Sequence, residues 1–251
     1  MAIYLFDLDG TMYHGTKIVP EARLLVEQLI KRRQAFYFLT NNASRTPAEN
    51  VELMKSIGFS SLSVSQFFNS AMACVSYTAK HFSGRQVMMI GQAGLAVELA
   101  KHGFSIVREG ADLVMVGLNQ SGNYQLYSLA LRNLLAGAVL IGTNQDRILL
   151  NEEGANIGNG SVIKLLEYAS GQEALITGKP SEIFLDEALA YWQLDREEVI
   201  IVGDNLETDI LCGLNAGVKT IFVLGGVHDI ADIDRLQIKP DRIISTLKEL
   251  I

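Results

Sequence analysis

The sequence predicts an α/β protein built on a doubly wound parallel sheet, and three observations lead to that prediction. Short apolar runs typical of buried strands alternate with amphipathic helical segments along the whole chain. Polar residues follow several of these runs, and the carboxyl ends of strands are where open α/β sheets bind ligands. The runs are too numerous for one sheet, so we expect the 251 residues to form two α/β units.

The N-terminal part of the chain gives the clearest signals for individual elements. Residues 3–6 form an apolar run that predicts the first strand, and Pro20 occupies a position typical of a helix start. A second buried strand is expected over residues 35–39. Pro47 opens the next predicted helix, and Gly58 ends it. Strands and helices therefore alternate as parallel sheets with crossover helices require.

The rest of the chain continues this alternation. A glycine-rich segment, residues 157–161, precedes a helix that we expect to begin near Val162. The glycines suit a tight loop, although a helix N-terminus of this kind is also able to bind an anion. Further strands are expected at residues 87–90, 113–116, 139–141, 199–202 and 220–224.

Composition and charge exclude several classes of protein. Apolar residues make up 49% of the chain, but no uninterrupted run reaches the roughly 20 residues of a membrane-spanning helix. The formal charge of −7 argues against nucleic acid polymers as partners, because they favour a basic surface. Cys74 and Cys212 lack metal or redox spacing, and the N-terminus lacks the features of a signal peptide. We therefore expect a cytoplasmic protein.

The most informative motif is Asp7-Leu8-Asp9-Gly10-Thr11, directly behind the first predicted strand. It brings two carboxylates, one residue apart, onto a glycine turn at the carboxyl end of a buried strand. An Asp-Gly turn that closes a hairpin is the alternative interpretation. The motif indicates acid–base or nucleophilic chemistry only if other polar residues meet it at the same edge of the sheet.

Four further residues are expected to lie near this motif, because each follows an apolar run or opens a helix. They are Thr40, Lys179, Asp204 and Asp209. Together these groups would supply a nucleophile, a proton donor and a cation, which phosphoryl transfer needs. Simpler interpretations exist for each. Thr40 and the following asparagines suit a helix cap and turn, Lys179 a solvated helix start, and the aspartates solvent-facing caps.

The four motifs, in this order, resemble motifs I to IV of the haloacid dehalogenase superfamily. They are Asp-Leu-Asp-Gly-Thr, Thr-Asn-Asn, Gly-Lys-Pro and Gly-Asp-Asn-Leu-Glu-Thr-Asp. The likeness covers essentially the whole chain and is closest to the NagD-like branch of subclass IIA, which comprises sugar-phosphate and nitrophenyl-phosphate phosphatases. It implies a Mg²⁺-dependent phosphomonoester hydrolase with a Rossmann-like core, acting on small cytosolic sugar phosphates or nucleoside monophosphates through an aspartyl-phosphate.

The resemblance also implies roles for single residues. Asp7 would attack phosphorus, and Asp9 would serve as general acid and then general base. Mg²⁺ would be held by Asp7, the backbone carbonyl of Asp9, and Asp204. Lys179 would neutralise Asp7 and the transferring group, and Thr40 would hydrogen-bond the phosphoryl oxygens.

Further residues would support these groups or bind the substrate. Asn205 and Asp209 would orient Lys179 and the waters on the metal. Residues 143–146 resemble the family's Thr-Asn-Pro-Asp segment, but Gln145 replaces the proline and loosens a rigid turn. A strand-end turn is the alternative interpretation of this segment. The implied substrate-binding residues are Asn41, Asn42, Thr143, Asn144 and Asp146.

An inserted cap domain is implied as well. The flap at residues 13–15 is short, whereas the interval from 42 to 179 has room for an independent domain. The resemblance therefore implies a catalytic core of residues 1–79 and 176–251 and an α/β type II cap of residues 80–175. Such a cap would close over the site, exclude water and recognise the leaving alcohol.

Functions of other kinds stay open at this point. A phospho-acceptor signalling domain uses similar acidic residues around Mg²⁺, but it is about half this length and lacks an acid two residues beyond its acceptor. A phosphate-binding protein without turnover would not need every catalytic position filled. A phosphotransferase or mutase shares the first half-reaction. The expected partner is a small phosphate monoester, and a homodimer also stays open because relatives often pair through their caps.

Overall fold

The computed structural model describes residues 2–151 and 154–251, and the chain divides into two compact α/β units. The first, here called the core unit, comprises Met1–Thr40, Pro47–Phe68 and Lys179–Ile251. The second, here called the insert unit, comprises Asn41–Thr46 and Asn69–Gly178. The predicted fold class is confirmed, because each unit is built on a parallel sheet with helices against it.

The sheet of the core unit has the strand order β15-β14-β13-β1-β4-β5, and the pairings from β15 to β4 are parallel. Read from β5 and numbered within the unit, this is the 3-2-1-4-5-6 order of doubly wound sheets. The order reverses between β1 and β13, where such folds bind ligands. The strands are β1 (Ile3–Asp7), β4 (Phe36–Thr40), β5 (Phe67–Asn69), β13 (Val199–Gly203), β14 (Lys219–Val223) and β15 (Arg242–Ile244).

Helices cover both faces of this sheet. On one face, α1 (Pro20–Lys31) and α2 (Pro47–Ser56) pack on Phe36 and Phe38 of β4. On the other face Tyr37, which lies between them, stacks on Trp192 at the end of α7 (Glu182–Trp192), with ring centroids 4.3 Å apart. Each large apolar side chain buried in this way contributes about 1.5–3 kcal/mol to folding.

Short elements complete the core unit. They lie between its strands and helices along the chain, and η3 follows the carboxyl end of β13 after two residues. These elements are β2 (Tyr13–His14), β3 (Lys17–Ile18), η1 (Val64–Gln66), η2 (Arg196–Glu198), the π-helical turn η3 (Leu206–Ile210), α8 (Leu211–Asn215), α9 (Ile230–Leu236) and η4 (Leu247–Leu250).

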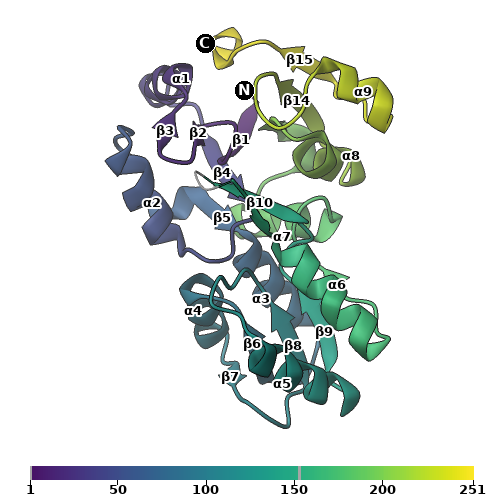
Figure 1. Ribbon diagram of the computed structural model, residues 1–251. Coiled ribbons are helices and arrows are strands. Elements are labelled where there is room, and N and C mark those ends of the chain that lie inside the picture. Colours follow the sequence, from purple (N-terminus) through teal and green to yellow (C-terminus); the bar gives the residue numbers. More distant parts are fainter. Residues whose placement is uncertain (1, 152–153) are drawn as a thin grey trace. The chain divides into compact units, whose positions relative to one another are not determined.

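The insert unit is a second three-layer arrangement, with the parallel strand order β12-β9-β8-β6-β7. Helices α3 and α4 pack on one face of the sheet, and α5 and α6 pack on the other; Figure 1 shows α4 and α6 on opposite sides of its strands. The antiparallel pair β10–β11 forms a hairpin beside α6. The elements are α3 (Ser70–His81), β6 (Gln86–Ile90), α4 (Ala93–Lys101), β7 (Ser105–Ile106), β8 (Leu113–Val116), α5 (Tyr124–Leu135), β9 (Val139–Gly142), β10 (Ile148–Asn151), β11 (Gly154–Ile157), α6 (Asn159–Ser170) and β12 (Leu175–Ile176).

The unit boundaries differ from those expected for the core and the cap. The long segment of the insert unit spans Asn69–Gly178, where residues 80–175 were expected for the cap, and the insert unit also includes Asn41–Thr46, which were expected in the core. Helix α3 therefore belongs to the insert unit, because its buried residues join the same apolar cluster as β6 and α4. That the insert unit acts as a cap stays a prediction. Among the described helices, none has both the length and the apolarity that crossing a bilayer demands.

Candidate active site

Three aspartates gather at the carboxyl edge of the core-unit sheet, where the strand order reverses. Asp7 is the last residue of β1, Asp204 directly follows β13, and Asp209 lies in η3. One carboxylate oxygen from each lies within 4.8 Å of the others. All three are buried, with exposed fractions of 7%, 1% and 1%. The alternative interpretation of Asp204 and Asp209 as solvent-facing caps is therefore wrong.

Lys179 joins two of these carboxylates. Its Nζ donates hydrogen bonds to Oδ1 of Asp7 at 2.6 Å and to Oδ1 of Asp209 at 2.7 Å. The side chain is 2% exposed, and a buried ammonium group is tolerated only with such partners because it has lost its hydration. A solvated helix start, the simpler interpretation of this lysine, is excluded by its burial.

The site carries more negative than positive charge. When all three carboxylates are ionised, the single ammonium group of Lys179 leaves two of the negative charges uncompensated. Burial, reinforced by Asp209 and only partly offset by Lys179, raises the pKa of Asp7 well above its usual range. Burial and Asp209 also raise the pKa of Asp204 to about 6. Burial alone would lower the pKa of Lys179, but the charges of Asp209 and Asp7 outweigh it and raise that pKa.

Two neighbours fix the carboxylate of Asp204. The Thr11 hydroxyl donates to its Oδ1 at 2.9 Å, and the Val227 backbone N–H donates to its Oδ2 at 2.7 Å. A Cβ at Gly226 would lie 2.0 Å from Oδ2, so this loop approaches closely only because the residue is glycine. Sequence reasoning assigned no role to these residues. The available signals were Thr11 inside the first motif and a glycine pair after an apolar strand.

Asn205 helps to hold Asp209. Its side-chain oxygen accepts from the backbone N–H groups of Glu207 and Thr208 at 3.0 and 3.3 Å and so caps η3. Its own N–H donates to Oδ2 of Asp209 at 3.2 Å. Asn205 therefore shapes the turn that presents Asp209 to Lys179, and its predicted contact with metal-bound waters stays a prediction.

Asp9 and Thr40 lie at the same edge of the sheet. Asp9 is exposed on the turn after β1, and Thr40 is the buried last residue of β4, which pairs with β1. The turn needs Gly10, which has φ 99° and whose Cβ would lie 2.3 Å from Oδ2 of Asp204. The strand order β13-β1-β4 thus brings Asp204, Asp7 and Thr40 together from distant parts of the chain.

Most of the predicted substrate-binding residues lie together in the insert unit. The Asn41 amide donates to the two carboxylate oxygens of Asp146 at 3.3 and 3.4 Å. The Asn144 amide donates to the backbone oxygen of Asn41 at 2.7 Å. Thr143 and Asn144 are buried, at 0% and 4% exposed. Asn41 of the second motif and the Thr-Asn-Gln-Asp segment therefore form one polar cluster.

Asn42 has a structural contact of its own. Its side-chain oxygen accepts from the backbone N–H of Ser44 at 2.9 Å and from the Ser44 hydroxyl at 2.5 Å. This is the turn geometry named as the alternative interpretation of the second motif. A substrate-binding role for Asn42 stays a prediction.

Sequence comparison places the chain in a known family. A model of haloacid dehalogenase-like hydrolases matches residues 4–105, and a HAD-hydrolase-like model matches residues 176–250. The 5'-nucleotidase YutF of Bacillus subtilis is 34% identical over 248 residues, which cover 99% of this chain and 96% of that protein. The acid sugar phosphatase of Staphylococcus aureus is 32% identical, over 99% of this chain and 96% of that protein.

Solved structures agree with this placement. A 4-nitrophenylphosphatase from Thermotoga maritima superposes with a TM-score of 0.93 at 27% identity, covering 100% of this chain and 96% of that one. A glycerol phosphate phosphatase from Mycobacterium tuberculosis, in complex with magnesium, superposes with a TM-score of 0.92 at 30% identity, covering 99% of this chain and 76% of that one.

A doubly wound sheet with an aspartate cluster and a buried lysine at its reversal point is an arrangement suited to phosphoryl transfer. The chain belongs to the haloacid dehalogenase-like hydrolases, and its relatives lie in the NagD-like subclass IIA. It is a phosphoric monoester hydrolase. The resemblance read from the four motifs is confirmed.

Proposed function

We propose that this protein is a Mg²⁺-dependent phosphatase of small cytoplasmic phosphate monoesters, such as sugar phosphates or nucleoside monophosphates, and that it acts through an aspartyl-phosphate on Asp7. The observation that carries the proposal is the buried Lys179 between Asp7 and Asp209, with Asp204 beside them. The names of the relatives, which include a 5'-nucleotidase, an acid sugar phosphatase and a glycerol phosphate phosphatase, support the substrate class.

Asp7 is the nucleophile in this proposal. One of its oxygens forms a bond to phosphorus while the bond from phosphorus to the alcohol oxygen breaks. Lys179 contacts Asp7 directly, so its charge favours the ionised carboxylate and offsets the charge of the phosphoryl group. Thr40 and the Asn41 backbone bind the phosphoryl oxygens.

Asp9 moves the proton. It protonates the departing alcohol oxygen, and it then accepts a proton from the water that attacks the aspartyl-phosphate and regenerates Asp7. The position of Asp9 is compatible with this role, because it lies on the turn directly after β1, two residues beyond Asp7.

Mg²⁺ fits the residues of the site. Its ligands would be Asp7, Asp204 and the backbone carbonyl of Asp9, an all-oxygen set of the kind that this ion prefers. The two uncompensated negative charges and the raised pKa of Asp204 are what a divalent cation would relieve. When bound, the ion would reduce the repulsion between the nucleophile and the phosphate dianion and orient both.

The insert unit supplies substrate recognition in this proposal and acts as the cap. The cluster of Asn41, Thr143, Asn144 and Asp146 would contact the substrate. Its hydrogen bonds support a fixed segment even though Gln145 replaces the proline of the family pattern. The chemistry thereby belongs to the core unit and the choice of alcohol to the insert unit.

The test is phosphate release from p-nitrophenyl phosphate and from a panel of sugar and nucleoside monophosphates, with Mg²⁺ or with chelator. Asp7→Asn should lower turnover at least about a thousandfold, because it removes the nucleophile's charge but keeps its shape and an oxygen for Lys179. Asp195→Asn, at an exposed aspartate of the same unit, is the matched control and should be fully active. An Asp7→Asn protein that keeps most of its rate would contradict the covalent mechanism.

Hydrolysis and transfer are separated by one addition to this assay. Both reactions share the aspartyl-phosphate, so an acceptor alcohol such as glycerol is added at high concentration and the products are analysed. A hydrolase releases inorganic phosphate almost alone, whereas a phosphotransferase yields glycerol phosphate in proportion to the acceptor.

A further inference from the structure

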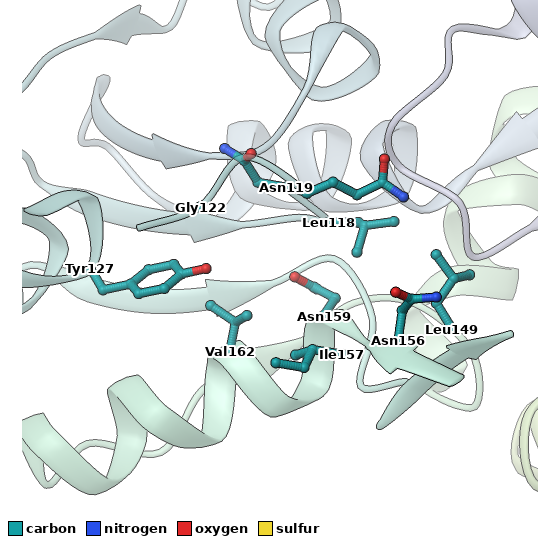
Figure 2. Close-up of a pocket in the computed structure, with 10 residues that line it drawn as sticks. Leu118, Asn119, Gly122, Tyr127, Leu149, Asn156, Ile157, Asn159 and Val162 are labelled. Carbon is teal, nitrogen blue, oxygen red and sulfur yellow. The ribbon is translucent and has the colours of Figure 1, made fainter. Parts of the chain in front are cut away.

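The insert unit contains a pocket of about 720 Å³ at the carboxyl edge of its own sheet. Its walls come from the loop after β8, from α5, from the β10–β11 hairpin and from the first turn of α6, as Figure 2 shows. Read from β7, the strand order of this sheet is 2-1-3-4-5, which reverses between β6 and β8. Ligands bind beyond the carboxyl ends of strands near such a reversal, and the volume is typical of small-molecule sites.

Asn159, the first residue of α6, has a fixed orientation in this pocket. Its side-chain nitrogen donates to the backbone oxygens of Val116 and Asn144, at 3.1 and 3.0 Å, and lies 3.4 Å from the Thr143 hydroxyl. Carbonyl oxygens accept but never donate, so the amide cannot be turned over without losing both bonds. In Figure 2 the other end of the amide, Oδ1, points into the space that Tyr127, Leu118 and Val162 surround.

The Oδ1 atom of Asn159 is a buried acceptor that lacks a donor. The residue is 2% exposed, and within the described residues no group donates a hydrogen bond to this oxygen. Leaving a buried acceptor unsatisfied costs about 1–3 kcal/mol, and native proteins leave few such atoms. A molecule in the pocket that offers an O–H or N–H group would remove this cost.

The rest of the lining limits the chemistry of that molecule. Every described residue that lines the pocket is uncharged, so a carboxylate or a second phosphate would find no cation there. Asn119, Gln120 and Asn156 offer amide groups, which both donate and accept, as hydroxyl groups do. Leu149 and Ile157 offer aliphatic surface to the C–H groups of such a molecule. The lining suits a neutral molecule rich in hydroxyl groups better than an anion.

We propose that this pocket binds a neutral polyol group, such as glycerol or a sugar, and that Asn159 selects it by accepting a hydrogen bond from one of its hydroxyls through Oδ1. Asn159 also bonds to the backbone of Asn144, so an occupied pocket would steady the substrate-binding segment. Two sources have this chemistry, the alcohol part of a phosphate ester and a free polyol. The first source rests on the proposed function, and the second does not.

The binding test uses the full chain and saturation-transfer NMR with glycerol, with 1-propanol as the probe that lacks the extra hydroxyls. Leu149→Trp fills the pocket from β10, and Ile148→Trp is its matched control, since it lies next to it on the opposite face of the same strand and is 55% exposed. Wild type and Ile148→Trp should give a glycerol signal several times that of 1-propanol, and Leu149→Trp should lose it. Equal signals from the two tryptophan variants, or none from wild type, would overturn the proposal.

Asn159→Ala tests the hydrogen bond itself. It should reduce the glycerol signal to that of 1-propanol, about a tenfold loss of affinity, since a donor–acceptor bond of about 1.4 kcal/mol corresponds to that factor. If only a water occupies the site, the variant will lower stability and leave glycerol binding unchanged, which contradicts the proposal. Because the variant also removes two structural bonds, Leu149→Trp decides the question should Asn159→Ala fail to fold.

Kinetics then distinguish the two sources. Glycerol 3-phosphate and n-propyl phosphate contain three-carbon alcohols that differ only in their hydroxyl groups. Hydrolysis of p-nitrophenyl phosphate, which contains neither alcohol, measures the activity of the core site. A preference of about tenfold in kcat/KM for glycerol 3-phosphate, lost in Leu149→Trp, assigns the pocket to the substrate. Glycerol binding without this preference assigns it to a free polyol. Failure to hydrolyse all three esters would contradict the proposed phosphatase function and leave the NMR result to decide on the pocket.

Discussion

The two units build the same kind of sheet edge and place opposite chemistry on it. At the carboxyl edge of the core sheet lie three aspartates and a lysine, all buried and strongly coupled in charge. At the corresponding edge of the insert sheet lie amides and aliphatic side chains around Asn159, and the described lining is neutral. Because the scaffold is shared, the side chains that follow the strands decide what each unit does.

The two sheet edges also differ in the stability that a substitution would cost. A charge removed from the core edge leaves another charge buried without a partner, which costs several kcal/mol. A polar group removed from the insert edge costs a neutral hydrogen bond, about 0.5–1.5 kcal/mol. Substitutions in the core unit should therefore alter stability, metal binding and rate, and substitutions in the insert unit should alter selectivity.

Lys179→Met is expected to have the largest effect. It leaves Asp7 and Asp209 buried without their shared cation, so the free energy of unfolding should fall by about 3–5 kcal/mol, and turnover should be lost. Urea denaturation of the metal-free protein measures the first effect, and the p-nitrophenyl phosphate assay measures the second.

Lys55→Met is the matched control for that loss. Lys55 pairs with Glu52 at 2.9 Å, but the two side chains are 49% and 73% exposed, so the change should be below about 1 kcal/mol. If both variants lose a similar free energy of unfolding, burial does not make the ion pairs of Lys179 stronger than that of Lys55.

Removal of the metal should make stability depend on pH through Asp7 and Asp204, because burial raises the pKa of both carboxyl groups. The pKa of Asp204 is raised to about 6, so the folded state holds a proton there that the unfolded state, with a pKa near 3.9, has released. Stability should therefore fall as pH rises through 6, by about 1–2 kcal/mol between pH 5 and 7.5 in chelator. Mg²⁺ should restore stability at pH 7.5 more than at pH 5, because protons compete with it.

Asp204→Asn measures how much of this pH dependence comes from Asp204. It keeps an oxygen for the Thr11 hydroxyl but no longer titrates, so its unfolding free energy in chelator should vary less between the two pH values. Thermal or urea unfolding of both proteins, with and without Mg²⁺, provides the comparison. An equally steep pH dependence in Asp204→Asn would assign the effect to other groups.

Much of the core site could be predicted because its signals are local. The apolar run predicts a buried strand, and the residues that follow it place Asp7 and Asp9 at its carboxyl end. Parallel pairing then brings the carboxyl ends of neighbouring strands together. The burial of Lys179 could not be read in this way. A single lysine before a proline is equally compatible with solvent, and its partners are 172 and 30 positions away.

Features that depend on contacts between residues far apart in the sequence were not predicted. Thr11 and Asp204 are 193 positions apart, and nothing near either residue in the sequence indicates their bond. Helix α3 shows an apolar face, but periodicity does not say which sheet that face covers, so the sequence did not indicate that α3 packs with the insert sheet. Asn159 lies among glycines that suggested a tight loop, whereas its first-turn position makes it both a support for Asn144 and a pocket residue.

Thr11→Val should weaken metal binding while leaving the fold intact. The variant keeps the size of the side chain but removes the donor that fixes Oδ1 of Asp204, and loss of a partner behind a metal ligand typically costs about tenfold in metal affinity. The Mg²⁺ concentration for half-maximal activity measures it. Thr16→Val, at an exposed threonine of the nearby turn, should leave that concentration unchanged.

Asn144→Ala is expected to have the smallest effect and to test the insert side of the comparison. It removes the amide that donates to the Asn41 backbone, so the ranking of phosphate esters should shift by a few-fold while the Mg²⁺ requirement stays the same. Asn123→Ala, which removes the side-chain cap of α5 in the same unit, should lower stability by about 1 kcal/mol without changing the ranking. If Asn144→Ala instead changes the Mg²⁺ requirement and spares the ranking, the separation of chemistry from recognition between the two units is wrong, because a neutral hydrogen bond in the insert unit would then control the charged site of the core.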